Sequence, residues 1–280
     1  MKKYILSMKP KTSLHDNNFS MKTLKMVAEA ISTPMSHIFN LSINTGVFPK
    51  KLKITRCIPI FKSGDPTNVG DYRGVCMINQ FSKVWEKIVY DSLLGFLESN
   101  KFFSINQFGF RKHTSTAHAI AAITMKITEK LNDEKFVLAL MIDIKKCFDV
   151  LDRDILLKKL ERCGVRGVCL KWFRSYFTDR RQRVFINGAN STNIEDILYG
   201  VLQGSILGVL LFLIYINDLP SACRRLISYL FADDATTITW GDNINDLIAL
   251  TNYELIELQK WYSSNRLILH PQKTKCMIFK

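Results

Sequence analysis

The stretch 228–240, SYLFADDATTITW, constrains the fold of this chain more than any other. Two adjacent carboxylates, Asp233 and Asp234, separate two runs of strand-forming residues, 227–231 and 236–240, which predicts two strands joined by a tight turn. A turn between apolar strands usually carries Gly or Asn. Two acids put like charges side by side, which is unfavourable unless cations neutralise them. Because Asp also favours turns, a solvated turn without further function is the alternative.

A third carboxylate, Asp143, ends the segment 136–144, FVLALMIDI. This nearly continuous apolar run suits a strand that is buried on both faces, where an ionised carboxylate is costly unless it is paired or binds a metal. Lys145 or Lys146 would be a purely structural partner. If this strand and the acidic hairpin are sheet neighbours, the three carboxylates converge and offer hard oxygen ligands for two Mg²⁺ ions that also bind phosphates. Two such ions, about 3.5–4 Å apart, stabilise both the attacking and the leaving oxygen of a phosphoryl displacement.

The charge balance points to a polyanionic partner. The net charge is +14, from 39 basic and 25 acidic residues, and residues 1–62 alone carry 11 Lys or Arg against two acids, a balance of +9. Seven cysteines contain no C-x-x-C pair and five histidines no H-E-x-x-H. This pattern favours reduced, intracellular thiols and argues against a structural zinc site and a zinc hydrolase.

One segment has the length and apolarity of a membrane span. Residues 197–216, ILYGVLQGSILGVLLFLIYI, also contain two overlapping G-x-x-x-G patterns. The polar, flexible Gln203, Gly204 and Ser205 interrupt the segment and leave an apolar helix of about 12 residues, which is too short to cross a bilayer. We therefore favour a buried core helix and no membrane contact, with a membrane-embedded protein as the alternative.

Hydrophobic periodicity and turn signals give a mixed order of elements. Residues 1–19 lack periodicity and predict a mobile or extended leader. Helices are expected at 20–31, 34–45 (with Pro34 in its first turn), 80–98, 114–132, 153–163, 167–178 and 245–264. Strands are expected at 52–61, 136–144, 182–187 (ending in an Asn187-Gly188 turn), in the acidic hairpin, and in a final hairpin of 266–270 with 276–279. This mixture predicts the α+β class.

Taken in order, several blocks resemble the reverse transcriptase domain of non-LTR (LINE-type, jockey-like) retrotransposons. DIKKCFDVLDRDILLKKLERCGV, GVLQGSILGVLLFLIYINDLP, FADD and NRLILHPQKTKCMIF are similar to four palm motifs of that family. IPIFKSGDPTNVGDYRGVCMINQFSKVWEKIV and NQFGFRKHTSTAHAI resemble its finger motifs. FADD alone is a weak signal, but the ordered series, from about Lys9 to Lys280, is a strong one.

The resemblance implies a right-hand polymerase with fingers and palm, whose antiparallel palm sheet packs on helices and whose thumb is absent. The implied ranges are 1–49 for a basic leader and helices, 50–135 for the fingers and 136–280 for the palm. The implied activity is RNA-directed DNA polymerisation, which adds dNTPs to a primer 3′ end on an RNA template with two Mg²⁺, or alternatively Mn²⁺. A nuclear location is also implied by the family.

The resemblance further implies roles for single residues. Asp143 and Asp233 would be the main metal ligands, with the Ile144 carbonyl assisting and Asp234 nearby. Phe148 would stack under the sugar and exclude a 2′-hydroxyl, or else be a core residue. The nucleotide-binding set comprises Lys62 and Arg73 on the triphosphate, Gln203 and Gly204 against template and incoming nucleotide, and Lys273 near the pyrophosphate. For both lysines a plain surface position is the alternative.

A basic and aromatic segment, 171–185, has the composition of a nucleic-acid surface. The candidate contacts are Arg174, Arg180, Arg181 and Arg183. An amphipathic helix with Trp172, Phe173, Tyr176 and Phe177 in the core is the alternative. Cys147 stands where the family usually has Ala. Because no thumb is expected, a second functional hypothesis is a truncated or inactive retroelement fragment that binds nucleic acid without synthesis.

Overall fold

A computed structural model describes residues 1–11, 19–186 and 188–280, and helices and two sheets together confirm the α+β class. The chain forms two compact units, each built from two separate stretches. Unit 1 comprises Met1–Asn100 and Arg153–Leu211, and unit 2 comprises Lys101–Asp152 and Phe212–Lys280. The three consecutive ranges expected from the sequence do not coincide with these units, because both units take residues from the middle of the chain.

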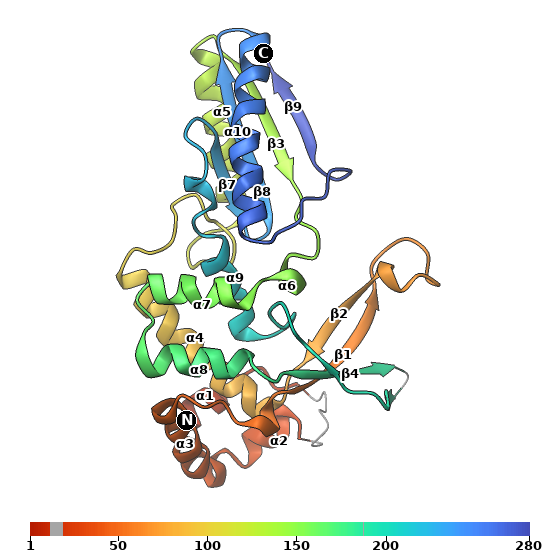
Figure 1. Ribbon diagram of the computed structural model, residues 1–280. Coiled ribbons are helices and arrows are strands. Elements are labelled where there is room, and N and C mark those ends of the chain that lie inside the picture. Colours follow the sequence, from red (N-terminus) through yellow and green to blue (C-terminus); the bar gives the residue numbers. More distant parts are fainter. Residues whose placement is uncertain (12–18, 187) are drawn as a thin grey trace. The chain divides into compact units, whose positions relative to one another are not determined.

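Unit 1 combines a helical layer with a sheet of order β2-β1-β4-β5, in which β6 also pairs with β4 (Figure 1). The strand β1 runs antiparallel to β2 and parallel to β4. The strands are β1 (Ile54–Phe61), β2 (Tyr72–Met77), β4 (Arg181–Ile186), β5 (Ala189–Asn190) and β6 (Glu195–Asp196). The helices are α1 (Lys2–Ser7), α2 (Met21–Met26), α3 (Ala28–Thr45), α4 (Gln80–Ser99), α7 (Arg153–Arg162), α8 (Gly167–Phe177) and the first part of α9 (Ile206–Ile216).

Aromatic side chains fill the core of unit 1. Phe48 is fully buried and its ring meets those of Trp172 and Tyr176 edge-on, at centroid distances of 5.4 and 5.1 Å. The indole nitrogen of Trp172 donates to the Ser42 hydroxyl at 3.0 Å, so the polar end of the ring is satisfied. All four aromatic residues at 172, 173, 176 and 177 are buried. The core interpretation of these aromatics is therefore confirmed.

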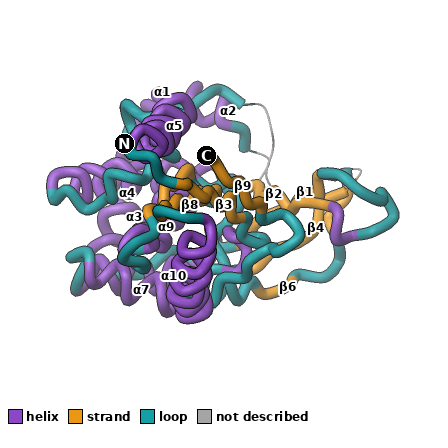
Figure 2. Tube along the Cα trace, turned by 90° about the horizontal axis from the view of Figure 1, so that it is seen from above, coloured by secondary structure: helices purple, strands orange, loops and turns teal. Residues whose placement is uncertain are grey.

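Unit 2 is built on an antiparallel sheet of order β7-β8-β3-β9. The faces of β8 alternate: Ile238 packs against the apolar side of α5, whereas the Thr239 hydroxyl bonds to Thr251 of α10 at 2.7 Å. Figure 2 shows α5 and α10 on opposite sides of the strands. The elements are α5 (Thr116–Asn132), β3 (Phe136–Ile142), α6 (Cys147–Val150), the second part of α9, β7 (Ile227–Phe231), β8 (Asp234–Gly241), α10 (Ile244–Ser264) and β9 (Lys275–Phe279).

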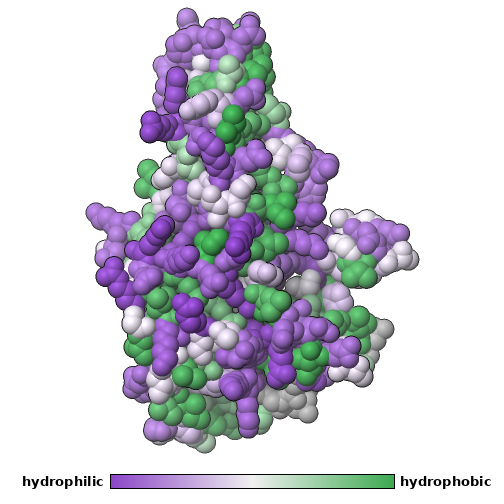
Figure 3. All heavy atoms as spheres, viewed as in Figure 1, coloured by the Kyte–Doolittle hydropathy of each residue, from purple (hydrophilic) through white to green (hydrophobic). Residues whose placement is uncertain are grey.

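The apolar segment that resembled a membrane span is a core element. The helix α9 has 11 residues and begins after Ser205, and Leu210–Ile216 are at most 1% exposed. Within the described residues, no helix combines the length and apolarity that crossing a membrane requires. On the face shown in Figure 3, hydrophobic and hydrophilic residues are interspersed.

Three sequence expectations are corrected. Residues 2–7 form the helix α1 with Ile5 fully buried, because this apolar side chain finds a core to join; residues 12–18 of the expected leader lie outside the described part. Pro34 lies inside α3, and the break before that helix falls at Val27. The final hairpin is absent within the described residues, because β9 pairs with β3 instead. Asn187, expected in a turn, also lies outside the described residues.

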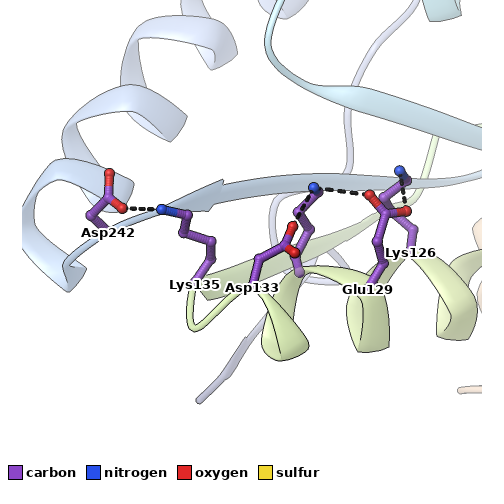
Figure 4. Close-up of polar contacts among 6 residues, drawn as sticks. Lys126, Glu129, Asp133, Lys135 and Asp242 are labelled. Atoms are coloured by element: carbon purple, nitrogen blue, oxygen red, sulfur yellow. Dashed lines mark hydrogen bonds and ion pairs between the residues drawn. The ribbon is translucent and has the colours of Figure 1, made fainter.

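At one end of the unit 2 sheet, surface charges are paired. Lys135 precedes β3 and forms an ion pair with Asp242, which follows β8 (Figure 4). On the neighbouring α5, Glu129 accepts from Lys126 at 2.6 Å and from Lys130 at 2.9 Å. Lys130 also forms an ion pair with Asp133 at 2.7 Å. Lys126 and Lys130 both lie over the Trp240 ring. Each acid in this group therefore has a cation beside it.

Candidate active site

Strand register brings the three predicted carboxylates to the opposite end of the same sheet. Ile142 of β3 pairs with Ala235 of β8, so the next residue, Asp143, faces Asp234. The pair Phe231 and Asp234 closes the β7–β8 hairpin, which leaves Ala232 and Asp233 as the two turn residues. The predicted strand–turn–strand is thus confirmed, as is its position beside the buried strand.

The turn itself is strained. Ala232 has φ +57°, and among the described non-glycine residues Asp233 is not one of those with positive φ. A two-residue hairpin with positive φ only at its first central position usually carries Gly there. An L-residue in this region costs about 1–2 kcal/mol. Since strained backbone clusters at functional sites, the conformation of Ala232 is consistent with a turn shaped for the placement of Asp233.

Electrostatic repulsion marks this end of the sheet. Partial burial raises the pKa of Asp234 above its ordinary value, and the charges of Asp233 and Asp143 raise it further. The ammonium of Lys273 lies 4.0 Å from a carboxylate oxygen of Asp143, and both side chains are substantially exposed. A contact of that length and exposure is weak. The three acids therefore keep an attraction for cations.

A thiol contacts the turn from the side. Cys147, the first residue of α6, donates its S–H to Oδ2 of Asp233 at 3.3 Å. Burial raises the pKa of the Cys147 thiol far above its ordinary value, and Asp233 raises it further. The thiol is therefore neutral and acts as a weak donor that orients the carboxylate. An alanine at this position would make no such bond.

Backbone hydrogen bonds hold Asp143 and the loop that carries Lys273. The amide of His270 donates to the Asp143 carbonyl at 2.9 Å, and the amide of Lys145 donates to the Ile268 carbonyl at 2.8 Å. The Lys273 amide in turn donates to the His270 carbonyl at 3.0 Å. The segment before β9 is thus attached to the end of β3, which gives the contact between Lys273 and Asp143 a structural basis. The role of the Ile144 carbonyl stays a prediction.

The donor set fits a divalent ion of the magnesium type. No three His, Cys, Asp or Glu side chains in the described part of the chain form a ready-made metal cage. Mg²⁺ does not require one, because it keeps several waters and is bound through one or two carboxylates together with substrate phosphates. Asp143, Asp233 and Asp234 supply hard oxygens at one sheet end, and all three are at least partly accessible.

Phe148 lies on α6, next to this carboxylate end. Its ring stacks on Phe212 with centroids 4.6 Å apart and an interplanar angle of 27°. The side chain is nevertheless half-buried, not fully buried. One face of the ring is therefore fixed by core packing, and its role under a sugar stays a prediction.

In unit 1, the two predicted triphosphate cations share a β-ribbon. Arg73 of β2 is opposite Ile60 of β1, and the Lys62 amide continues the ladder by donating to the Asp71 carbonyl at 3.0 Å. Because residues two apart on a strand share a face, Lys62 and Arg73 are diagonal neighbours, about 7–8 Å apart at the backbone. Both side chains are exposed. The ribbon therefore presents two cations on one face.

The Gln203–Gly204 loop is joined to the same ribbon. The Cys76 amide of β2 donates to the Gln203 carbonyl at 2.8 Å. Gly204 has φ +97°, and a Cβ there would lie 3.1 Å from the Cys76 carbonyl oxygen, so only glycine fits both demands. The approach to Cys76 explains the glycine within the chain itself, and contact of Gln203 and Gly204 with template and incoming nucleotide stays a prediction.

A buried carboxylate that the sequence analysis missed supports this loop. Glu86 of α4 is fully buried, accepts from the Tyr176 hydroxyl at 2.7 Å, and accepts from the Ile206 amide at the start of α9 at 3.1 Å. Burial raises the pKa of Glu86 above its ordinary value, although Arg180 opposes that rise. In the sequence, only the helical periodicity of residues 80–98 places Glu86 on the buried side. Because such a position normally holds an apolar residue, the periodicity alone does not predict a buried carboxylate.

Arg180 was predicted to contact nucleic acid, but its side chain is buried. Its side chain is 1% exposed, its Nε donates to the Tyr176 carbonyl at 2.6 Å, and its guanidinium lies 4.0 Å from the centre of the Tyr176 ring. Packing on this aromatic core therefore removes it from the surface. Arg174 and Arg181 are exposed and Arg183 is half-buried, so nucleic-acid binding by these three stays a prediction.

Comparison with known proteins agrees with this geometry. The family model described as "Reverse transcriptase (RNA-dependent DNA polymerase)" matches residues 60–278. Among similar proteins, a probable RNA-directed DNA polymerase from transposon BS of Drosophila melanogaster is 28% identical over 96% of this chain. The RNA-directed DNA polymerase from mobile element jockey of the same organism is 25% identical, also over 96% of this chain.

A third relative, the putative 115 kDa protein in type-1 retrotransposable element R1DM of Drosophila melanogaster, is 27% identical over 91% of this chain and 24% of its own length. The chain spans about 30% of the length of the first two relatives. The matched range covers well over half of the chain and includes all three carboxylates and the β1–β2 cations. The chain therefore belongs to the reverse transcriptase (RNA-dependent DNA polymerase) family, and its relatives are non-LTR retrotransposon proteins.

Proposed function

We propose that this chain is the polymerising part of a retrotransposon RNA-directed DNA polymerase, which adds dNTPs to a primer 3′ end along an RNA template. The observation that carries the proposal is the register of β3, β8 and β7. It gathers Asp143, Asp233 and Asp234 at one sheet end. Family membership and the names of the relatives support the same activity.

Polymerases of this family generally use divalent metal ions. We propose two Mg²⁺ ions, with Mn²⁺ as a substitute, held chiefly by Asp143 and Asp233, with the Ile144 carbonyl and Asp234 beside them. Bound there, the ions would activate the attacking primer oxygen and neutralise the leaving oxygen. The carboxylates fix where positive charge is held, the Cys147 thiol orients Asp233, and Lys273 adds a positive charge near Asp143 for the departing pyrophosphate.

The remaining residues would bind the substrate. Lys62 and Arg73 would pair with the triphosphate, since cations on one ribbon face match several phosphate oxygens. Gln203 and Gly204 would contact the template and the incoming nucleotide, and Phe148 would lie under the sugar and exclude a 2′-hydroxyl. In this assignment the unit 2 sheet belongs to the palm (136–280), and the β1–β2 ribbon belongs to the fingers (50–135).

Template and primer would lie along basic surface. The net charge of +14 supports an electrostatic contribution to that binding. Arg174, Arg181 and Arg183 are the proposed contacts in the segment 171–185. These contacts would make binding salt-dependent.

Primer extension on an RNA template tests the proposal. The 280-residue chain should extend a DNA primer with dNTPs in Mg²⁺, and Asp233→Asn should abolish extension. Asp242→Asn is the matched control, because it makes the same chemical change at the opposite end of the sheet. Extension by Asp233→Asn at the wild-type rate would remove the mechanism. Salt-sensitive RNA binding without extension in any divalent metal would instead favour a fragment that binds without synthesis.

A further inference from the structure

A short segment, at the start of the block NQFGFRKHTSTAHAI, lies alongside the strand that leads into the acidic turn, and none of its residues has yet been given a role. Residues 106–109 form a parallel bridge to β7, with Gln107 opposite Leu230. The Leu230 amide donates to the Asn106 carbonyl and the Phe108 amide donates to the Leu230 carbonyl, both at 2.8 Å. The last residues of β7 are therefore held from both sides, by β8 and by this segment.

The side chain of Gln107 reaches the turn itself. It is fully buried, and its Oε1 accepts from the Gly109 amide at 2.8 Å and from the Ala232 amide at 3.2 Å. Its Nε2 is buried without a hydrogen-bond partner among the described residues. Leaving a buried donor unsatisfied is unfavourable. The favourable contribution of this side chain therefore comes from the two hydrogen bonds that its oxygen accepts. One acceptor thus joins the segment to the residue that carries the strained backbone.

Gly109 closes the contact. A Cβ at this position would lie 2.1 Å from the Ala232 nitrogen and 2.8 Å from the Phe231 carbonyl carbon. No real side chain approaches backbone atoms so closely, so any larger residue must push the turn away. Glycine is therefore required for the segment to touch the turn at all.

We infer that Gln107 and Gly109 are positioning residues, which clamp Ala232 in its left-handed conformation and so aim Asp233 and Asp234 toward Asp143. The inference rests on the proposed function for its catalytic meaning, but the clamp itself is a property of the free chain. Without it, the two-residue turn relaxes and the carboxylates separate. Metal affinity and turnover then fall while the rest of unit 2 stays folded.

Gln107→Met tests the clamp, because it keeps the size of the side chain and removes the accepting oxygen. Gln259→Met, on the exposed surface of α10, is the matched control. Hydrogen exchange of the Ala232 amide in the free 280-residue chain should accelerate at least about tenfold in Gln107→Met and remain unchanged in Gln259→Met. Equal exchange in all three proteins would overturn the clamp, whatever their activity.

Mn²⁺ binding separates positioning from a merely structural role. Changing groups that support metal ligands typically lowers affinity about 10- to 100-fold, and we expect a loss in that range for Gln107→Met, measured by electron paramagnetic resonance at a temperature where both chains are folded. Primer extension should lose kcat with little change in KM for dNTP. A lower melting temperature with unchanged Mn²⁺ affinity would mean support of the fold only and would contradict the inference.

Gly109→Ala gives an independent test by a different physical route. The added methyl should displace the turn and weaken Mn²⁺ binding at least as much as Gln107→Met does. Gly95→Ala is the control, because a Cβ there meets nothing within 4 Å. Wild-type Mn²⁺ affinity in Gly109→Ala would overturn the inference. A wild-type chain that binds Mn²⁺ without extending a primer would defeat the proposed function and leave the clamp standing.

Discussion

The two ends of the unit 2 sheet differ in whether their acidic side chains are paired with cations. Where β3 begins and β8 ends, Asp242, Glu129 and Asp133 each have a lysine beside them (Figure 4). Where β3 ends and β8 begins, three aspartates gather, and the ammonium of Lys273 stands 4.0 Å from one of them. Burial and mutual repulsion raise the pKa of Asp234 there.

The two ends differ in how far their negative charges are neutralised. Surface ion pairs contribute little to stability. Two of the lysines, Lys126 and Lys130, also cover the Trp240 ring with their side chains. Uncompensated like charges are unfavourable in the free chain and are retained where a ligand supplies the opposite charge. We therefore propose that the carboxylate end serves the chemistry and that the paired end is solvated surface.

The largest effect on primer extension is expected for a change at the carboxylate end. Asp143→Asn should lower primer extension by at least about 100- to 1000-fold, the range for removal of one preorganised electrostatic group. Asp133→Asn, at the paired end, should leave the rate unchanged. Single-turnover extension in Mg²⁺ measures both. Similar losses in the two variants would mean that the two ends of the sheet do not differ in function.

A smaller effect concerns the cation at the carboxylate end. Lys273→Ala should slow extension about 10- to 100-fold, a part of the loss expected for a primary electrostatic group, with the KM for dNTP less affected. Lys260→Ala, on the surface of α10, is the control. Steady-state kinetics would refute the assignment if the two lysine variants behaved alike, since Lys273 would then be a plain surface residue.

Removing one of the three like charges should stabilise the metal-free chain. Asp234→Asn should raise the free energy of unfolding of the metal-free chain at pH 7, by at most about 1 kcal/mol because solvent screens partly exposed charges. The pKa of Asp234 is higher in the folded chain than its ordinary value of 3.8. Its protonated form therefore favours folding, and this favourable contribution is fully present below pH 3.8 and is lost as the pH rises through the raised value.

The advantage of Asp234→Asn should accordingly vanish in acid and grow with pH. Urea unfolding at several pH values measures it. A variant less stable than the wild type at pH 7, or a difference that does not change with pH, would contradict repulsion at this end.

The smallest effect belongs to the paired end. Lys135→Met removes the partner of Asp242 and should change the melting temperature by no more than about 2–4 °C, with primer extension unaffected. Calorimetry and extension assays check the two parts. A large loss of activity would show that this end participates in function and would dissolve the contrast.

Local patterns in the sequence predicted most elements of the fold. The acidic hairpin, the buried strand before Asp143 and the short core helix α9 followed from periodicity and turn chemistry, and the convergence of the aspartates followed once the two strands were taken as neighbours. Pairings between distant segments were not predictable in this way. β9 could pair with a nearby strand or with β3, and only the available sheet edge decides which.

Roles that depend on tertiary contacts were also missed or misassigned. Arg180 lies in a segment with the composition of a nucleic-acid surface, yet it is buried against the aromatic core around Tyr176. Gln107 and Gly109 lie in a block that resembles a finger motif, but the pattern assigned neither a role, and the hydrogen bond of Gln107 to Ala232 joins positions 125 residues apart. Periodicity reports which face of an element is buried, but not which distant backbone it meets.

Mn²⁺ titration of the 280-residue chain, followed by electron paramagnetic resonance, tests the central claim most directly. We expect that the wild type binds Mn²⁺, that Asp143→Asn and Asp233→Asn each weaken binding at least about tenfold, and that Asp242→Asn binds like the wild type. If Asp143→Asn and Asp233→Asn bound Mn²⁺ as tightly as the wild type, these two aspartates would not form one metal site.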